Sequence, residues 1–269
     1  MSLADLWSWL GDPLRAGSYV NLAEPVRVHG LLMALAAGVM MPLAVLLARY
    51  FKILPSQDWP RELNRRFWSI GHLALGYGAS FLAAAALVLV FQARPEDADH
   101  LAHGHALIGW LAMAMLLALL INGWQRGSTG GPGKPAPGTL GPLHGVAGDH
   151  YDMTARRRWF ERTHKLLGYL LLAVLFLCVL SGLWQASAPR WALVMLAAWW
   201  VTLLLLALRW ERQGRCVDGY QAKWGPSMAH PGNRIPELGW GSRRYSEEEF
   251  QRLPWVSKRS RKGKPTATV

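Results

Sequence analysis

Four histidines stand out in this chain because each lies near the start of a long apolar stretch. They are His29, His72, His105 and His164. A histidine inside a membrane helix is costly and usually faces the interior of the bundle for a reason. Neutral imidazole is a common axial ligand of haem iron, and two imidazoles on one iron give a six-coordinate centre suited to electron transfer. The pattern predicts two such centres and, with them, transmembrane electron transfer.

The apolar stretches themselves are long enough to cross a bilayer, which takes about 20 helical residues. We expect five spans, at Val26–Phe51, Phe67–Phe91, His105–Trp124, His164–Trp184 and Trp191–Trp210. The predicted fold is an all-α integral membrane protein, with an up-down four-helix haem-binding core and a fifth transmembrane helix alongside. The chain then divides into an outer interfacial segment 1–25, a membrane domain 26–210 and a basic cytoplasmic tail 211–269.

The net charge of +12 first suggests a nucleic-acid partner, but its distribution argues against one. The loops after the first and third spans are basic, as is the tail, whereas the loops on the opposite face are poor in Lys and Arg. This positive-inside pattern predicts an external N-terminus and a cytoplasmic C-terminus, in what we expect to be a bacterial inner membrane. Membrane topology therefore accounts for the charge, and the expected neighbours are membrane lipids.

Helix order predicts which histidines pair. Consecutive helices with short connections are antiparallel neighbours, so parallel helices lie across the bundle from each other. His29 and His105 would then hold an outer haem b, and His72 and His164 an inner haem b. At 1.5 Å of rise per residue, the two levels should lie on the order of 20 Å apart. No Cys-x-x-Cys-His motif is present, which excludes covalent attachment of c-type haem.

Three of these histidines are followed four residues later by glycine, at Gly76, Gly109 and Gly168. Positions i and i+4 lie one above the other on a helix, so each glycine removes bulk beside its histidine. A flat macrocycle could pass there. The alternative is a contact between helices through small residues, which is common in membranes.

Other residues could compete for these roles. His103 precedes His105 by two positions, which turns it about 160° away on a helix, and it could instead hydrogen-bond a haem propionate or an external substrate. Asp149, His150 and Asp152 could ligate a metal, but a solvated turn before the fourth span is the favoured interpretation. Pro42 is expected to kink the first span, with the freed carbonyl satisfied inside the bundle. Ser2 and Asp5 could cap a short interfacial helix, although a mobile terminus is an alternative.

The first span also resembles the first core helix of the cytochrome b561 domain. The resemblance rests on HGLLMAL at residues 29–35, on Met41-Pro42 and on ARYF at residues 48–51. Phe67-Trp68 before His72, and the His-x-x-x-Gly patterns in the later spans, resemble the later core helices of that family. The match runs from about Val26 to Trp210.

The resemblance implies one haem b for each diagonal pair of histidines and electron transfer between the two faces of the membrane. Family members often take electrons from cytoplasmic ascorbate and reduce monodehydroascorbate or ferric iron on the other side. Four cations could attract such an anion, with contacts to lipid headgroups as the plainer alternative. These are Arg49, Lys52, Arg65 and Arg66.

The chain departs from the family in showing five helices, where many members have six, and in its basic tail. A membrane quinol as donor, or an external redox protein as acceptor, therefore remains open. Two rival functions also remain. One is a dihaem anchor that passes electrons from an external dehydrogenase to quinone, and the other is a haem-free, metal-binding transporter or assembly factor. The chain could also associate as a homodimer.

Overall fold

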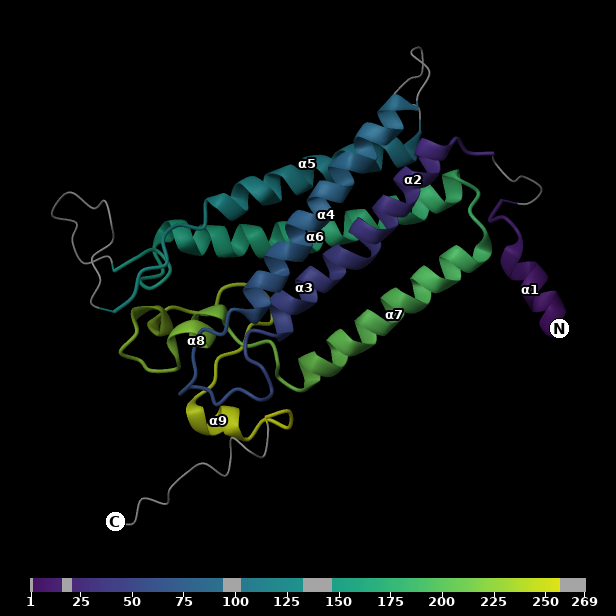
Figure 1. The fold of residues 1–269 in the computed structure, drawn as a ribbon. Helices are drawn as coiled ribbons and strands as arrows, with labels where there is room; N and C mark the ends of the chain where they lie inside the picture. The colour runs from purple at the N-terminus through teal and green to yellow at the C-terminus, as the bar shows by residue number, and fades with distance from the viewer. Residues whose placement is uncertain (1, 16–20, 94–102, 133–146, 257–269) are drawn as a thin grey trace. The chain divides into compact units, whose positions relative to one another are not determined.

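The computed structural model describes residues 2–15, 21–93, 103–132 and 147–256 (Figure 1). Within these ranges the protein is all-helical, and strand-like pairing is limited to isolated bridges. Among the described residues, five helices are long and apolar enough to cross a membrane. They are α2–η1–α3 (Glu24–Tyr50), α4 (Phe67–Gln92), α5 (Gly104–Trp124), α6 (Ala155–Gln185) and α7 (Arg190–Arg212). The protein is a multi-pass, all-α integral membrane protein, as the sequence predicted.

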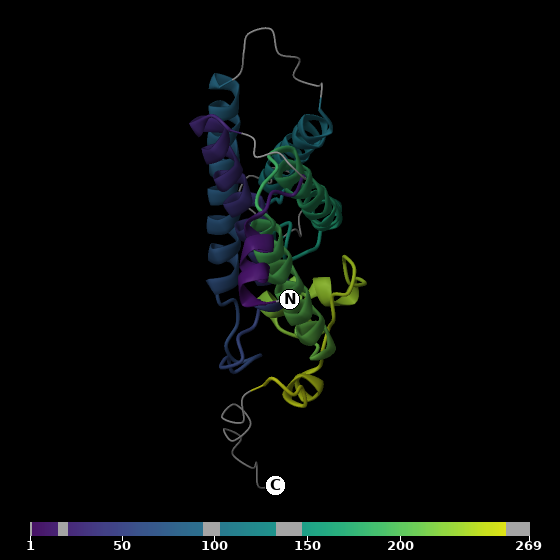
Figure 2. The ribbon, with the colours of Figure 1, turned by 90° about the vertical axis from the view of Figure 1, so that its right-hand side faces the viewer.

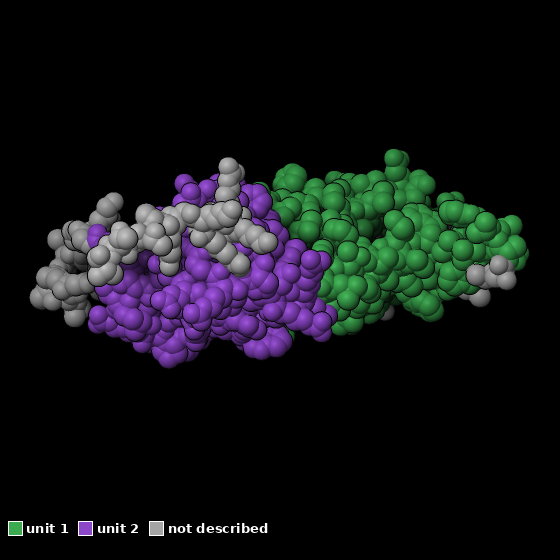
Figure 3. Space-filling view, turned by 90° about the horizontal axis from the view of Figure 1, so that it is seen from below, with its two compact units in different colours: residues 1–45, 72–118, 168–206 green, residues 46–71, 119–167, 207–269 purple. Residues whose placement is uncertain are grey.

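The chain forms two compact units, coloured separately in Figure 3. Unit 1 comprises residues 1–45, 72–118 and 168–206, and unit 2 comprises residues 46–71, 119–167 and 207–269. Within unit 2, the chain after α7 packs with the loop after α3. The predicted segments 1–25, 26–210 and 211–269 stay a prediction.

Helix α6 extends well beyond the stretch expected from hydropathy. It begins at Ala155, nine residues before His164. The added residues include Arg156, Arg157 and Arg158, which are good helix formers but lower the hydropathy of any window that includes them. His164 therefore lies in the third turn of its helix, whereas His105 lies next to the first residue of α5.

The first span contains a π-helix, η1 (Ala34–Met40), between α2 (Glu24–Met33) and α3 (Met41–Tyr50). Pro42 has no amide hydrogen to donate to the carbonyl four residues earlier, which is that of Gly38. In unit 1 this carbonyl accepts the indole N–H groups of Trp199 and Trp200, at 3.2 and 2.9 Å. The expectation that the freed carbonyl is satisfied by a neighbouring helix is thus met by α7.

Unit 1 pairs its helices in antiparallel fashion. His29, near the start of α2, contacts the carbonyl of Ala86, which lies near the end of α4. His105, near the start of α5, contacts Ser181 near the end of α6. Figures 1 and 2 both show α2 and the later part of α4 side by side. These contacts follow the up-down order that the sequence predicted.

The N-terminal helix α1 (Leu3–Gly11) carries the predicted capping box, in which Ser2 and Asp5 bond each other's backbone N–H groups. Asp12, the residue after α1, ties this helix to the start of α7. The Arg190 guanidinium donates to the Asp12 carboxylate at 3.1 Å and lies over the ring of Trp9. The position of this helix at the outer membrane surface stays a prediction.

Unit 2 contains a small buried core, to which residues of the predicted basic tail 211–269 contribute. It includes the short helices α8 (Gly219–Trp224) and α9 (Glu247–Gln251) and the 3-10 turn η2 (Pro231–Arg234). Trp59, which is fully buried, donates its indole N–H to the carbonyl of Gln221 at 3.2 Å. The residues packed with Trp59 are Ile53, Val217, Ala222, Phe250 and Val256.

Candidate functional site

Two of the four histidines meet inside unit 1. The ring centroids of His29 and His105 lie 6.4 Å apart, and the ring planes are inclined by 84°. The two residues come from α2 and α5, the first and third spans, so this is the pair that helix order predicts. Both side chains are partly buried.

The separation of these rings fits two ligands on opposite sides of one iron. A metal–imidazole bond is about 2.0 Å long and the ring centroid lies roughly 1.1 Å beyond the bound nitrogen, so trans ligands have centroids about 6.2 Å apart. The observed separation of 6.4 Å is close to this value, so the pair fits the spacing that one iron between two imidazoles would need. A haem iron takes two such nitrogens in addition to the four of its macrocycle.

The other ring nitrogens have defined partners that set the tautomer. Nδ1 of His29 lies 2.8 Å from the carbonyl oxygen of Ala86, and Nδ1 of His105 lies 3.2 Å from that of Cys178. A carbonyl accepts only, so each Nδ1 must carry the proton and donate it. Nε2 is then left with a lone pair, which is the state that binds a metal.

His72 belongs to unit 1 and shows the same arrangement. Its Nδ1 lies 3.0 Å from the carbonyl oxygen of Ala44, so the proton is again held by the backbone. His164 belongs to unit 2, where its ring lies 5.2 Å from that of Phe160. The prediction that His72 and His164 form a pair stays a prediction.

The three predicted glycines differ in their surroundings. A Cβ added at Gly76 or Gly168 would meet no atom within 4 Å. A Cβ at Gly109 would lie 3.9 Å from the Cys178 sulfur, an ordinary contact. Tight helix–helix packing therefore does not explain Gly76 and Gly168, and the space beside them is available to a flat group.

Arg49, one of the four cations considered for anion binding, is already engaged. Its guanidinium pairs with both carboxylate oxygens of Glu211 at 3.0 Å and also donates to the carbonyl of Trp240. Gly241, with φ of +68°, allows this loop to approach closely, since a Cβ there would lie 2.5 Å from the Arg49 guanidinium. Arg49 thus joins α3, α7 and the loop after η2 within unit 2.

Lys52 is buried and donates from Nζ to the carbonyl of Val217 at 2.9 Å. Burial, followed by the positive charge of Lys165, lowers the pKa of Lys52 to about 8. A buried, backbone-bound lysine of this kind acts as a structural group of unit 2.

The remaining candidates lie at the surface. Arg65 is exposed and pairs with Glu62 at 2.7 Å, and Arg66 is exposed. His103 is exposed just before α5, where its carbonyl accepts the N–H groups of Ala106 and Leu107. These positions are open to solutes or headgroups.

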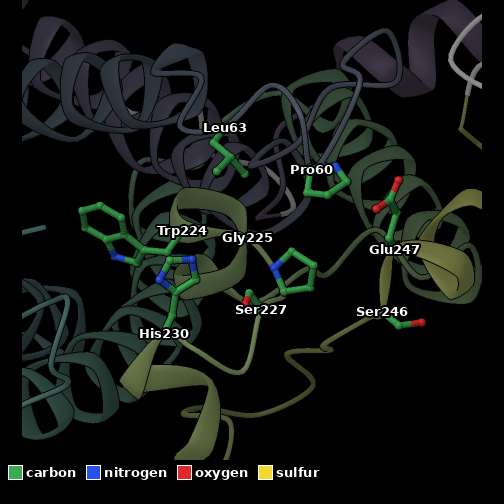
Figure 4. A pocket seen from close by; sticks show the side chains of 9 residues that line it. Pro60, Leu63, Trp224, Gly225, Ser227, His230, Ser246 and Glu247 are labelled. Carbon is green, nitrogen blue, oxygen red and sulfur yellow. The ribbon is translucent and has the colours of Figure 1, made fainter. Parts of the chain in front are cut away.

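A shallow hollow of about 470 Å³ lies in unit 2 (Figure 4). Its polar lining groups already have structural roles. The Tyr151 hydroxyl lies 3.2 Å from Nδ1 of His230, and the Ser246 hydroxyl accepts the N–H of Glu249 at the start of α9. The full lining is Pro60, Leu63, Trp224, Gly225, Pro226, Ser227, His230, Ser246 and Glu247. This arrangement assembles no recognisable catalytic group.

The acidic turn before α6 is built by internal hydrogen bonds. The Asp149 carboxylate accepts from the Ser128 amide and from the Thr154 hydroxyl, each at 2.8 Å. Asp152 accepts the N–H of Gly148. Among the described residues, no group of three or more His, Cys, Asp or Glu side chains is placed to hold a metal ion. The segment is therefore a hydrogen-bonded turn, although His150 within it is buried and not solvated as expected.

Two residues beside His105 were not anticipated. Ser181 Oγ lies 3.1 Å from Nδ1 of His105, and a Cβ at Gly182 would lie 2.9 Å from its Cε1. Neither residue stands out in the sequence, because serine and glycine are common in membrane helices.

The chain is similar over part of its length to a known protein. No protein-family model matches the chain, and no solved structure matches it. A protein of Arabidopsis thaliana, the cytochrome b561, DM13 and DOMON domain-containing protein, is 26% identical over 163 residues, or 61% of this chain. The aligned residues make up 15% of that relative, so this chain spans a small part of its length. The similarity supports a relationship to cytochrome b561 over part of the chain.

Proposed function

We propose that the protein is a membrane cytochrome that moves electrons across the bilayer, in which His29 and His105 would hold one haem b. The observation that carries the proposal is the 6.4 Å separation of the two imidazole centroids. The partial similarity to a protein named for cytochrome b561 supports it. Haem bound by two imidazoles supplies one-electron transfer and leaves no open position for oxygen.

The chain's own residues prepare this site. The carbonyls of Ala86 and Cys178 hold the Nδ1 protons of the two rings, so that both Nε2 atoms present lone pairs. Such outer partners orient the ring and raise its basicity. Gly76 and Gly168 follow His72 and His164 by four residues, and the open space beside them would leave room for a macrocycle at that second pair.

A second haem b, between His72 and His164, follows from the order of the helices. The hydrogen bond from Nδ1 of His72 to the Ala44 carbonyl prepares this imidazole in the same way as the other two. We place this haem on the cytoplasmic side and the His29–His105 haem on the outer side, following the distribution of basic loops.

For the donor, we propose a membrane quinol in preference to ascorbate. Arg49 and Lys52, which could have drawn an anion, are committed to Glu211 and to the Val217 carbonyl. The outer acceptor would be ferric iron, monodehydroascorbate or a redox protein. Electron flow in the reverse direction, from an external dehydrogenase to quinone, is the alternative for the same site.

The proposal can be tested on the purified full-length protein. Its absorption spectrum after dithionite reduction should show the sharp α-band of a low-spin haem b, with two haems per chain. Reduction by a short-chain quinol should be faster than reduction by ascorbate at equal concentration. A colourless protein would contradict the proposal and favour the haem-free alternative.

A further inference from the structure

We infer that Ser181 and Gly182, adjacent residues on α6, position His105 and thereby set the properties of the haem between His29 and His105. The inference rests on the proposed function. It adds two positioning residues that neither the histidine pattern nor the relative identifies.

Ser181 completes a three-membered hydrogen-bond cluster around Nδ1 of His105. Nδ1 lies 3.1 Å from the Ser181 hydroxyl oxygen and 3.2 Å from the Cys178 carbonyl oxygen. The hydroxyl itself donates to that carbonyl at 2.9 Å. Its hydrogen is therefore occupied, and its lone pair is free to accept from Nδ1. The imidazole N–H therefore faces two oxygen acceptors, and the sulfur of Cys178 also lies 4.0 Å from Nδ1.

The Ser181 hydroxyl is a side-chain partner of His105. The hydrogen bonds described above for His29 and His72 go to backbone carbonyls, that of Ala86 at 2.8 Å and that of Ala44 at 3.0 Å. A backbone carbonyl is present whatever the side chain, but a hydroxyl can be removed by substitution. Ser181 is thus a side chain through which the sequence can adjust the basicity of one axial ligand.

Gly182 provides the space in which the His105 ring lies. A Cβ at this position would be 2.9 Å from Cε1, 3.4 Å from Nδ1 and 3.6 Å from Nε2. The edge of the ring formed by these three atoms therefore lies against the backbone of α6. A free side chain could rotate away from an added methyl group, but a ring bonded to iron could do so only by straining or breaking that bond.

The first test uses substitutions at Ser181 in the full-length holoprotein. Loss of the second acceptor should make His105 a weaker donor to iron, which favours the reduced form. The haem to observe is the one that is lost in His29→Ala. We expect Ser181→Ala to retain this haem, to raise its midpoint potential and to shift its low-spin electron paramagnetic resonance signal. Ser181→Thr, which keeps a hydroxyl, should restore both.

Thr202→Ala is the matched control, because the Thr202 hydroxyl likewise donates to a carbonyl of its own helix, that of Ala198 at 2.8 Å, but at an exposed position on α7. An unchanged or lowered potential in Ser181→Ala, or an equal shift of every haem, would overturn the inference. A wild-type protein without haem would overturn the proposed function instead, so the two failures can be told apart.

The second test compares glycines beside two different histidines. Gly182→Ala should lose the haem that His29→Ala removes. Gly123→Ala should keep all haem, since a Cβ there would lie 4.0 Å from Cε1 of His164, an ordinary contact. Full haem content with an unshifted spectrum in Gly182→Ala would contradict the positioning role.

Discussion

The carbonyl oxygen of Gly38 accepts a hydrogen bond from the indole of Trp200 at 2.9 Å, four residues before a proline that cannot supply the usual amide. The indole of Trp199 donates to the same oxygen at 3.2 Å. The fifth span thus stabilises the irregular turn of the first. Gly38 also allows close approach, since a Cβ there would lie 3.1 Å from a methyl carbon of Leu196.

Replacing both Trp199 and Trp200 by phenylalanine should leave the Gly38 carbonyl without its donors. We expect a loss of about 1–2 kcal/mol in the free energy of unfolding, measured by denaturant titration in detergent. Adding Pro42→Ala restores a backbone N–H that can reach this carbonyl. The same double substitution should therefore cost clearly less in the Pro42→Ala background, and an equal cost in both backgrounds would count against this account.

Alanine at Gly76 or Gly168 tests whether the glycines make room for a cofactor. The protein offers no atom within 4 Å of either added methyl group, so folding should be unaffected or improved by up to about 1 kcal/mol. Haem content should nevertheless fall, because the methyl group would enter the space assigned to the macrocycle. Thermal unfolding and haem-to-protein ratio should be measured on the same samples. Full haem content in both variants would favour the plain helix-contact explanation.

Arg49→Gln should act through folding and not through donor binding. It leaves Glu211 without its bidentate partner, and we expect a loss of about 2 kcal/mol in the stability of unit 2. Limited proteolysis of the chain after α7 would detect this change. Arg66→Gln, at an exposed position, is the control and should leave stability unchanged. A raised donor KM in Arg49→Gln with normal protease resistance would instead assign Arg49 to the substrate.

Lys52 predicts a characteristic dependence of stability on pH. Its pKa is lowered to about 8 in the folded protein, mainly by burial, compared with about 10.4 in an unfolded chain. Between these values the unfolded state binds one more proton, so stability should rise with pH by a total of about 3 kcal/mol. Lys52→Met should abolish this rise.

The difference in stability between the wild type and Lys52→Met at each pH isolates the contribution of Lys52. Burial likewise lowers the pKa of Lys223 to about 8, but Lys223 is present in both proteins and cancels in the difference. Parallel stability curves for wild type and Lys52→Met from pH 7.5 to 10.5 would contradict the assignment.

Much of the membrane architecture could be predicted from the sequence, because bilayer thickness imposes a simple length requirement. The backbone irregularity before Pro42 and the Ser2 cap could also be predicted, since both depend on local backbone chemistry. The start of α6 could not be predicted in this way. The arginines in its first turns lower the mean hydropathy, so the apolar stretch begins later than the helix does.

The supporting contacts could not be predicted, since they join residues far apart in the chain. The sequence does not identify the carbonyls of Ala86 and Ala44 as histidine partners, because every residue has a backbone carbonyl. Lys52 was considered as a surface cation and proved to be buried, because the chain after α7 folds over it within unit 2. The four histidines could be chosen from the sequence as candidate ligands. The groups that hydrogen-bond to their rings can be identified only from the tertiary structure.

The central claim is that His29 and His105 share one iron, and the haem content of single substitutions tests it most directly. We predict that His29→Ala and His105→Ala each lose the same haem, so that their low-spin electron paramagnetic resonance spectra lack the same signal and retain the same remainder. The double variant should lose nothing further. Two variants that lack different signals, or that keep the full haem complement of the wild type, would contradict the account.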